Sequence, residues 1–141
     1  MGRSRYQSAP ESERELVDLM LRHVRREFGR RTKLAREVKT HGRFKTDVCL
    51  YADGRILAIE AKLVHWQRAL GQARLNTFYA DRSYIALWQS RLTDGIVLEA
   101  NKHGVGVIGV SRSGIAVVDS SVASKPDPAL RTRVLAATFA Q

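Results

Sequence analysis

Two acidic residues and a lysine stand at positions where one short hairpin brings them together. Asp47 precedes the dipeptide Asp53-Gly54, Glu60 follows it, and Lys62 comes two residues later. Carboxylates facing each other repel unless a cation lies between them. Mg²⁺ is commonly held by one or two carboxylates, with waters and phosphate oxygens completing its shell. The trio therefore predicts a site for a hard divalent metal; the alternative is a solvated hairpin face that Lys62 balances.

The elements that position this trio are two alternating runs on either side of Asp53-Gly54. An Asp-Gly pair between such runs predicts a tight turn. Counting outward from the turn gives the cross-strand pairs Tyr51–Ile56, Cys49–Ala58 and Asp47–Glu60. Opposite residues share a face with Cβ atoms roughly 5 Å apart, and strand alternation adds Lys62 to it. The other face is expected to be core and holds Val48, Leu50, Leu57, Ile59 and Ala61.

The order of Asp47, a hairpin and then Glu60-Ala61-Lys62 resembles the signature of the PD-(D/E)xK nuclease superfamily. Thr46 stands where the signature has its leading Pro, and Gln72 lies where many members carry a Gln on the following helix. The resemblance covers roughly residues 13–87. It implies an α/β fold with a restriction-endonuclease-like αβββαβ core, in which helices flank a central mixed sheet. Extra strands and a helix would follow at the C-terminal end.

The resemblance also implies an activity, the metal-dependent hydrolysis of phosphodiester bonds in DNA. Mg²⁺ or Mn²⁺ would be bound by Asp47, Glu60 and the carbonyl of Ala61. Lys62 would orient the attacking water or stabilise developing negative charge, and Gln72 would hydrogen-bond the water or the scissile phosphate. Members of this type act in repair, recombination or restriction. Because no separate sequence-reading domain is recognised, we expect cutting that is structure-selective or low in sequence specificity.

A further acidic residue is expected from the first helix, as in many members of the superfamily. Helical geometry places Glu13 near the centre of that helix's apolar face, so Glu13 is the candidate for catalysis and for a metal reached through water. Glu27 is a weaker rival. Cys49 shares the predicted site face but has no recognisable base partner. We therefore expect Cys49 to serve packing.

The charge balance favours a polyanionic partner. The net charge is +10, and residues 1–46 hold 13 Lys and Arg against 6 Asp and Glu. Lys and Arg neutralise phosphates and release counterions. The residues expected to contact nucleic acid are Arg26, Arg30, Arg31, Lys33, Arg36, Arg43, Lys45, His65 and Arg68. For any one of them the alternative is a solvated surface position.

Composition fits an ordinary globular domain. The 141 residues are 27% charged and 44% hydrophobic, which suits a single domain over 10–141 after a basic tail at 1–9. One cysteine excludes a disulfide framework, and no apolar run approaches 18 residues. We therefore expect a cytoplasmic protein that does not bind membranes. The 105–118 hairpin or the last helix is a candidate homodimer interface.

Periodicity and turn residues predict the remaining elements. Helices are expected over 10–28, 65–79, 93–104 and from Asp127-Pro128 onward, with strands at 34–39, 83–88, 105–110 and 115–118. His41-Gly42-Arg43 should turn the chain into the hairpin. The second helix should direct Trp66, Ala69, Leu70, Ala73 and Thr77 to the sheet, and His65, Arg68, Asn76 and Tyr79 to a polar flank.

Two interpretations from other functional classes stay open. The first is a catalytically silent nucleic-acid-binding module on the same fold, although the acidic and lysine positions are all present. The second is a non-nuclease α/β protein whose basic surface binds ribosomal RNA or a protein. Within the nuclease interpretation, RNA is the alternative substrate to DNA.

Overall fold

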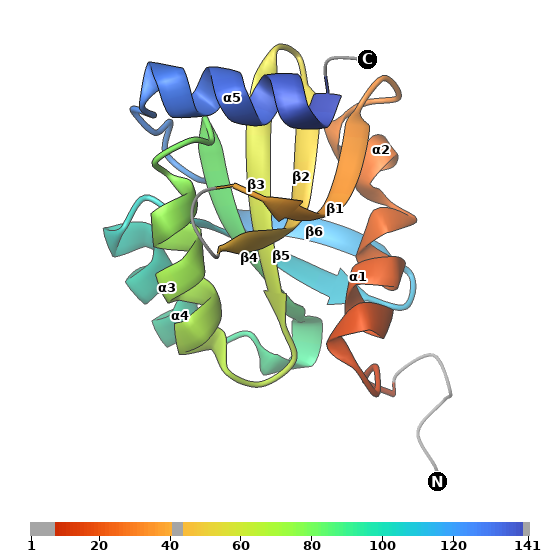
Figure 1. Cartoon of the computed structure of the whole chain (residues 1–141). Helices are drawn as coiled ribbons and strands as arrows, with labels where there is room; N and C mark the ends of the chain where they lie inside the picture. Colours follow the sequence, from red (N-terminus) through yellow and green to blue (C-terminus); the bar gives the residue numbers. More distant parts are fainter. Residues whose placement is uncertain (1–7, 41–43, 140–141) are drawn as a thin grey trace, which may run out of the picture.

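A six-stranded sheet forms the centre of the molecule, with its strands side by side in chain order (Figure 1). The computed structural model describes residues 8–40 and 44–139. The strands are β1 (Lys33–Lys39), β2 (Lys45–Ala52), β3 (Arg55–Lys62), β4 (Arg82–Trp88), β5 (Gly106–Ser111) and β6 (Gly114–Asp119). The predicted strands are thus confirmed to within one residue at each end. The predicted turn at 41–43 and most of the predicted tail lie outside the described residues.

The strand directions make this a mixed sheet, as expected. The β1–β2, β2–β3 and β5–β6 pairs are antiparallel, whereas β3–β4 and β4–β5 are parallel. A parallel pair needs a crossover connection, and helices α3 (Trp66–Asn76) and α4 (Asp94–Lys102) supply the two crossovers. The order helix, three strands, helix, strand matches the predicted αβββαβ core. Thr93 caps α4, since its Oγ1 accepts the Ile96 N–H at 3.2 Å.

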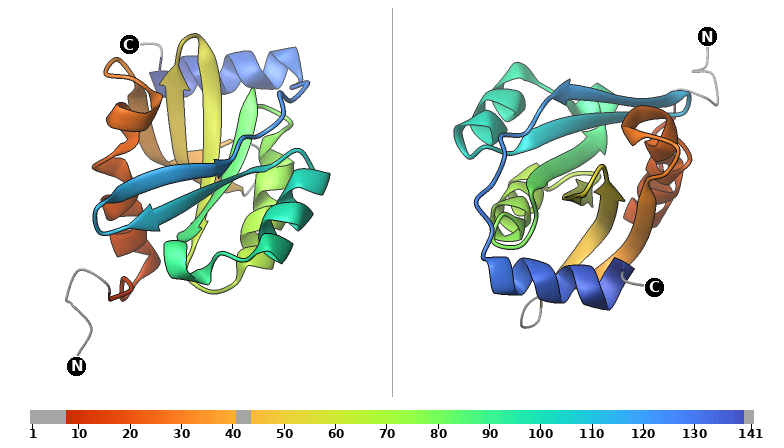
Figure 2. Two further views of the ribbon diagram at one scale, coloured as in Figure 1. Left: turned by 180° about the vertical axis from the view of Figure 1, so that it is seen from behind. Right: turned by 90° about the horizontal axis from the view of Figure 1, so that it is seen from above.

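Helices cover both faces of the sheet (Figure 2). Helices α1 (Glu13–Leu21) and α2 (Val24–Phe28) pack on the face that carries Val48 and Ile59. Helices α3 and α4 pack on the opposite face. Helix α5 (Pro128–Phe139) crosses the turn end of the β2–β3 hairpin on that second face. Among the described helices, none is long and apolar enough to cross a membrane.

The first predicted helix differs from expectation, because 10–28 forms two helices with a bend at Arg22 and His23. His23 has φ −118°, and its N–H bonds to the Met20 carbonyl. The bend keeps Met20 and Val24 on either side of it fully buried against the same face of the sheet. Gly29 ends α2 at φ 118°, a conformation that glycine adopts without a steric penalty.

Two residues of the α3 segment were assigned to the wrong side. Asn76 and Tyr79 are fully buried rather than on a polar flank, while Ala69, Leu70 and Ala73 face the sheet as predicted. The reason is the polar interior at this end of the sheet, where both side chains find hydrogen-bond partners. Burial of polar groups is tolerated where such partners exist.

The Asp53-Gly54 turn forms as predicted. Asp53 and Gly54 have φ angles of 52° and 75°, the signs that a type I′ turn requires. The pairs Ala52–Arg55, Tyr51–Ile56 and Cys49–Ala58 follow in the predicted register. Asp81 then fixes this end, because its carboxylate accepts the Ile56 N–H at 2.7 Å and holds Arg131 of α5 at 3.0 Å.

Candidate active site

At the end away from the turn, β2 and β3 separate. The paired register ends at Val48–Ile59. One residue further on, the Asp47 side chain enters the gap, and its Oδ2 accepts the Ala61 N–H at 2.8 Å. A side-chain carboxylate thus takes the place of a backbone acceptor in the ladder. The split brings the Asp47 and Glu60 carboxylates together, as the register predicted.

Strict alternation fails at this end of β2, which corrects the predicted common face for Asp47 and Cys49. Thr46 and Cys49 both contact the Tyr79 hydroxyl, at 2.6 and 3.3 Å, so these two point to the same side. Asp47 instead lines a cleft with Ala61. Across the β1–β2 pair, Glu37 lies opposite Asp47 and has φ 51°. A non-glycine residue with positive φ is uncommon and marks a locally strained backbone.

The two carboxylates lie within hydrogen-bonding reach of each other. Glu60 is 3% exposed. Burial raises the pKa of Glu60 to about 8, and the neighbouring Asp47 charge adds to the shift. Burial also raises the pKa of Asp47, opposed by the hydrogen bond from Ala61. A buried Glu60 beside a partly buried Asp47, both with raised pKa values, forms an electrostatically unfavourable pair, which is a frequent property of functional sites.

A buried polar network holds Glu60 from the side of α3. Asn76 donates from Nδ2 to Glu60 Oε2 at 2.7 Å. Its Oδ1 accepts the Thr46 hydroxyl at 3.1 Å, and Thr46 in turn contacts the Tyr79 hydroxyl. The sequence analysis missed Asn76 as a site residue, although its position four residues after Gln72 was a signal for it. A fixed carboxylate is the result, because each polar member has a partner.

Cys49 is next to this network, and its role there is to fill the core. Its side chain is fully buried. Burial raises the pKa of the Cys49 thiol to about 12, because a thiolate would lose its hydration there. Burial likewise raises the pKa of Tyr79. A thiol held protonated is a poor nucleophile.

Lys62 and Glu13 meet at the mouth of the site. Lys62 Nζ lies 3.3 Å from Glu13 Oε2, and the two side chains are 30% and 47% exposed. Glu13 therefore does reach the site, although it is exposed and not in the apolar centre of its helix. Two surface ion pairs, Arg112–Glu15 and Arg36–Asp18, hold α1 over the sheet and so place Glu13.

A cleft of about 530 Å³ opens in front of Asp47. Acidic and basic side chains from α1 and β1 surround it. Its lining residues are Glu13, Arg14, Val17, Arg36, Glu37, Asp47 and Ala61. The sequence analysis did not single out Arg14 or Glu37. Of the predicted phosphate contacts, Arg36 is at this cleft, and Lys45 is two residues from Asp47 on the same strand.

Gln72 lies one helical turn before Asn76 on α3. Its Nε2 is buried and has no hydrogen-bond partner among the described residues. A buried amide donor without an acceptor is costly, so the position is suited to an acceptor that the protein itself does not provide. Gln72 lines a hollow with Arg68, Arg74 and Phe78 and not the cleft in front of Asp47, so its predicted role stays a prediction.

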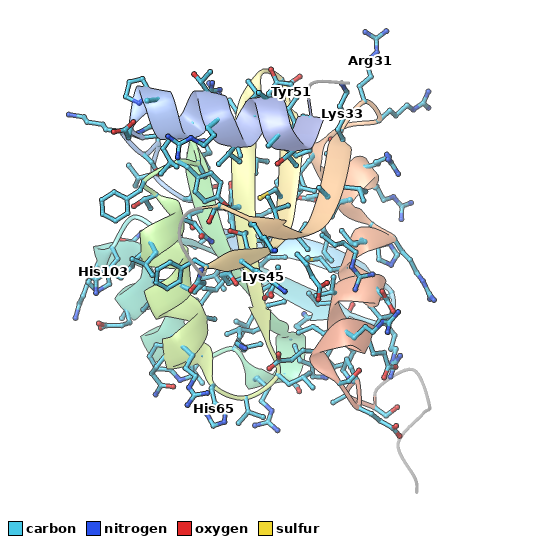
Figure 3. All side chains as sticks on the ribbon, in the orientation of Figure 1. Arg31, Lys33, Lys45, Tyr51, His65 and His103 are labelled. Carbon is cyan, nitrogen blue, oxygen red and sulfur yellow. The ribbon has the colours of Figure 1, made fainter. Side chains whose placement is uncertain are left out.

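The remaining basic candidates are dispersed. Figure 3 shows Arg31 and Lys33 near Tyr51 at the turn end, Lys45 at the middle of the molecule and His65 at the opposite end. The register agrees, since Lys33 pairs with Tyr51, about 13 Å along the strand from Asp47 at 3.3 Å per residue. The exposed residues Arg26, Arg30, Arg31 and Lys33 are thus not beside the carboxylates. His65, which precedes α3, and Arg68 on its first turn are both exposed, and Arg43 is outside the described residues.

The residues present fit a hard divalent cation held by two protein carboxylates. Within the described residues, no group of three or more His, Cys, Asp or Glu side chains is placed to hold a metal ion. Glu13 is therefore not a third direct ligand of the Asp47–Glu60 pair. Mg²⁺ needs only one or two carboxylates and keeps several waters. Burial raises the pKa of both acids, and the Lys62 charge opposes this shift at Asp47 without reversing it.

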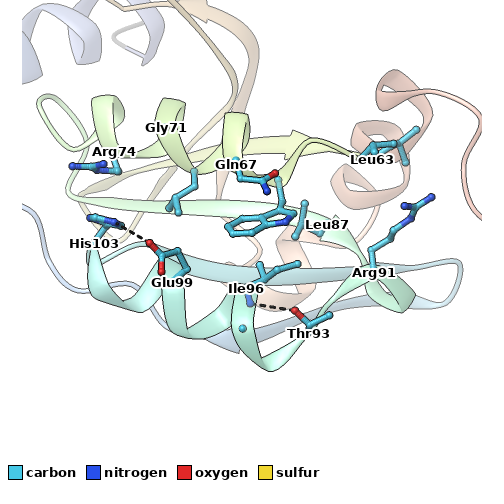
Figure 4. Close-up of a pocket in the computed structure, with 14 residues that line it drawn as sticks. Leu63, Gln67, Gly71, Arg74, Leu87, Arg91, Thr93, Ile96, Glu99 and His103 are labelled. Carbon is cyan, nitrogen blue, oxygen red and sulfur yellow. Dashed lines mark hydrogen bonds and ion pairs between the residues drawn. The ribbon is translucent and has the colours of Figure 1, made fainter.

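A second hollow, of about 740 Å³, lies between α3 and α4 (Figure 4). Leu70, Leu87 and Ile96 line it, and its single acidic residue, Glu99, pairs with His103 at 3.7 Å. This hollow lacks the crowded carboxylates of the first cleft. Of these two hollows, the one at the open end of the hairpin is therefore the one with closely spaced acidic side chains.

Comparisons with known proteins bear on the fold. No family model and no curated protein matches the chain. A protein of unknown function from Silicibacter pomeroyi is 19% identical with a TM-score of 0.72, over 94% of this chain and 86% of its own. A repair endonuclease from Pyrococcus abyssi is 23% identical with a TM-score of 0.51, over 75% of this chain and 50% of its own. The chain thus shares a mixed α/β fold with a repair endonuclease.

Proposed function

We propose that this protein is a metal-dependent nuclease of the PD-(D/E)xK type that hydrolyses phosphodiester bonds in DNA. The observation that carries the proposal is the crowding of Asp47 and Glu60 at the split end of the hairpin, with Lys62 at its mouth. A fold rarely places a buried acid beside a second, partly buried acid without a cation. The likeness in fold to a repair endonuclease supports the same interpretation.

The metal would be Mg²⁺ or Mn²⁺, because the available donors are oxygens. Asp47, Glu60 and the backbone carbonyl of Ala61 are the groups that would hold it. When bound, such an ion lowers the pKa of a coordinated water and neutralises a phosphate oxygen. Asn76 fixes the Glu60 carboxylate by its 2.7 Å hydrogen bond, and the Ala61 N–H fixes that of Asp47. Fixed ligands of this kind preserve the site's geometry before substrate arrives.

The other residues would act on the phosphate and the water. Lys62 is a compact cation with rotatable donors, so it would bind an anionic phosphate oxygen at the mouth of the site. Glu13 holds Lys62 Nζ at 3.3 Å and would keep it turned toward the cleft. The buried Nε2 of Gln72 would donate to the water or the scissile phosphate. Arg14 and Arg36 line the cleft and would bind flanking phosphates.

The test is cleavage of labelled single-stranded, duplex, flapped and four-way DNA with Mg²⁺, Mn²⁺ or EDTA. We expect metal-dependent cleavage that falls about 100-fold or more in Lys62→Ala, because transition-state charge stabilisation is worth several kcal/mol. Lys102→Ala is the matched control, since Lys102 is exposed on α4 and its ion pair among the described residues is with Glu99. The control should cleave like the wild type.

Salt-sensitive DNA binding without cleavage under any metal would contradict the proposal. That result would favour the catalytically silent binding module on the same fold. Cleavage that survives in Lys62→Ala would instead contradict the role given to Lys62. Circular dichroism of both variants separates these outcomes from unfolding, because Lys62 is partly exposed and its truncation opens no core.

A further inference from the structure

The hollow between α3 and α4 has the size of a small-molecule site (Figure 4). Its volume of about 740 Å³ is within the range of about 300–1,000 Å³ that such sites occupy. No described residue lines both this hollow and the cleft in front of Asp47. The chemistry of the two carboxylates therefore does not account for the hollow, which needs an explanation of its own.

The hollow is at the carboxyl ends of two neighbouring parallel strands. Leu63 and Val64 come directly after β3, and Arg91 and Thr93 come shortly after β4. In open α/β sheets, ligands bind in crevices outside the carboxyl ends of such strands. The hollow thus lies where this type of fold commonly binds a ligand.

Much of the lining is apolar. Leu70, Leu87 and Ile96 are core residues that reach the hollow from the sheet and the two helices. Trp66 is only partly buried and Val64 is 55% exposed, so apolar surface of the lining is in contact with water. Burying such surface is favourable, and a ligand that covers it must have an apolar body.

Two glycines keep the hollow open from both sides. Gly71 on α3 and Gly95 on α4 both line it, and no other described helix contains a glycine. A Cβ at Gly71 would meet no atom within 4 Å, and one at Gly95 would make ordinary contact with Thr93 Oγ1 at 3.8 Å. Alanine would therefore fit at both positions and would favour the helices. Packing does not require glycine here, whereas free space for a ligand does.

Two arginines at the hollow lack acidic partners. Arg74 and Arg91 are exposed lining residues, and neither forms an ion pair with a described acidic residue. Figure 4 shows them toward opposite ends of the hollow, with Leu87 and Ile96 between them. An apolar centre with a cation at its end is complementary to an amphipathic anion.

The acidic residues nearby favour the Arg91 end for the charged group of that ligand. Glu99 is the one acidic residue of the lining, and it is on the Arg74 side, 3.7 Å from His103. Asp94 is exposed on the first turn of α4 and does not line the hollow. A guanidinium group presents paired donors that match a carboxylate or a phosphate. An anionic group at Arg91 therefore meets these donors away from Glu99.

We propose that this hollow binds a small organic anion, with its apolar body on Trp66, Leu87 and Ile96 and its carboxylate or phosphate group at Arg91. The exposed apolar lining and the arginine without an acidic partner each match one part of such a ligand. The inference does not depend on the proposed nuclease function, because none of these residues belongs to the cleft at Asp47.

The test is calorimetric titration of the protein in EDTA and without DNA. The probes are 1-naphthylacetate, 1-naphthyl phosphate, the uncharged 1-naphthylacetamide, and acetate. At least one naphthyl anion should bind with a dissociation constant of about 1 mM or tighter, and the tighter of the two identifies the charged group. The amide should bind about tenfold more weakly, because it has no charge for Arg91. Acetate should not bind measurably, because it lacks the apolar body.

Two variants locate the probe. Arg91→Gln should weaken binding of the anions about tenfold and leave binding of the amide unchanged. Arg22→Gln is the matched control and should bind like the wild type, since Arg22 is exposed at the bend between α1 and α2, which pack on the other face of the sheet. Gly71→Leu should fill the hollow and weaken binding of both kinds of naphthyl compound more than tenfold. Its thermal midpoint should not fall, because leucine favours a helix more than glycine does.

The outcomes decide the inference whether or not Gly71→Leu folds normally, because Arg91 is exposed and its replacement opens no core. Wild-type affinity for the anions in Arg91→Gln would contradict the inference. Equal affinity for the anions and the amide would also contradict it, as would failure of both anions to bind at millimolar concentration. Weaker anion binding in Arg22→Gln would place the anion elsewhere on the basic surface and overturn the assignment to this hollow.

Discussion

The two ends of the β2–β3 hairpin are built in opposite ways. At the turn end, Asp81 and Arg131 satisfy each other and the backbone: Asp81 accepts the Ile56 N–H and binds Arg131, which also donates to the Gly54 carbonyl. At the open end, the ladder splits and two acids crowd together with raised pKa values. One end of the hairpin therefore stabilises the fold, whereas the burial and mutual repulsion of two carboxylates at the other end cost free energy.

Within the eight residues of β3, the turn end therefore contributes to stability and the open end carries the candidate site. An end whose charges are satisfied internally has little to offer a ligand. An end whose charges are unsatisfied gains free energy when a cation or a phosphate group arrives. Changes at the two ends should therefore have reciprocal effects, on stability at one end and on activity at the other.

The largest expected effect is at the open end, where Asp47→Asn should reduce cleavage about 100-fold or more. The substitution removes a charge needed to hold the metal, worth several kcal/mol in the transition state. Stability should stay the same or rise slightly, because the amide oxygen still accepts the Ala61 N–H. Cleavage rates and thermal unfolding, measured on the same samples, check both parts.

Asp53→Asn is the matched control at the other end of the same strand pair. Asn-Gly forms a type I′ turn as well as Asp-Gly does, so cleavage and stability should both stay unchanged. If Asp47→Asn lowered the free energy of unfolding by more than about 1 kcal/mol, Asp47 would be a structural residue, and the contrast between the two ends would disappear.

The next effect in size is at the turn end, where Asp81→Ala should lower the free energy of unfolding by about 2–4 kcal/mol. The change leaves the Ile56 N–H without its acceptor and frees Arg131, whose side chain is 26% exposed. Cleavage per folded molecule should not change, because Asp81 has no contact with the carboxylates. Denaturant unfolding and cleavage below the melting range provide the two readouts.

Asp119→Ala provides the comparison for that measurement, since the Asp119 carboxylate accepts an exposed hydrogen bond from Asn101. Its effect on stability should be below about 0.5 kcal/mol. A loss of cleavage in folded Asp81→Ala would show that the two ends are coupled through β3.

The structure of the turn end could be predicted from sequence because it depends on residues that are neighbours along the chain. Asp53 and Gly54 adopt positive φ by their own chemistry, and the register follows by counting. The strands and crossover helices likewise follow from local periodicity. The pairing of Asp47 with Glu60 is a consequence of that register, so the centre of the site could be predicted too.

The surroundings of the open end could not be predicted, because they depend on tertiary contacts. Alternation places Thr46 and Cys49 on opposite faces, whereas in the structure both side chains contact the Tyr79 hydroxyl. Helical arithmetic buries Glu13, but Glu13 is the first residue of α1, so its side chain is exposed and reaches Lys62. Counting charges gave a basic first third of the chain, but it could not show that Arg31 and Lys33 lie at the turn end.

The smallest of these effects is a stability change with pH at the open end, measured in EDTA. Glu60 has a pKa of about 8 in the folded protein and an ordinary value of 4.5. Between these values the unfolded chain has lost the proton and the folded protein keeps it. Stability should therefore fall as pH rises from about 5 to about 8 and then level off.

Glu60→Gln removes this titration, so its stability should be nearly flat over the same range. At pH 8 the variant should exceed the wild type by about 2 kcal/mol, because a neutral amide costs less to bury beside Asp47 than a carboxylate. Mg²⁺ should stabilise the wild type and not the variant. Glu27→Gln, at an exposed position on α2, should follow the wild-type curve. If the wild type were instead more stable at pH 8 than at pH 5, the open end would already be neutralised within the fold, and the two ends of the hairpin would not differ electrostatically.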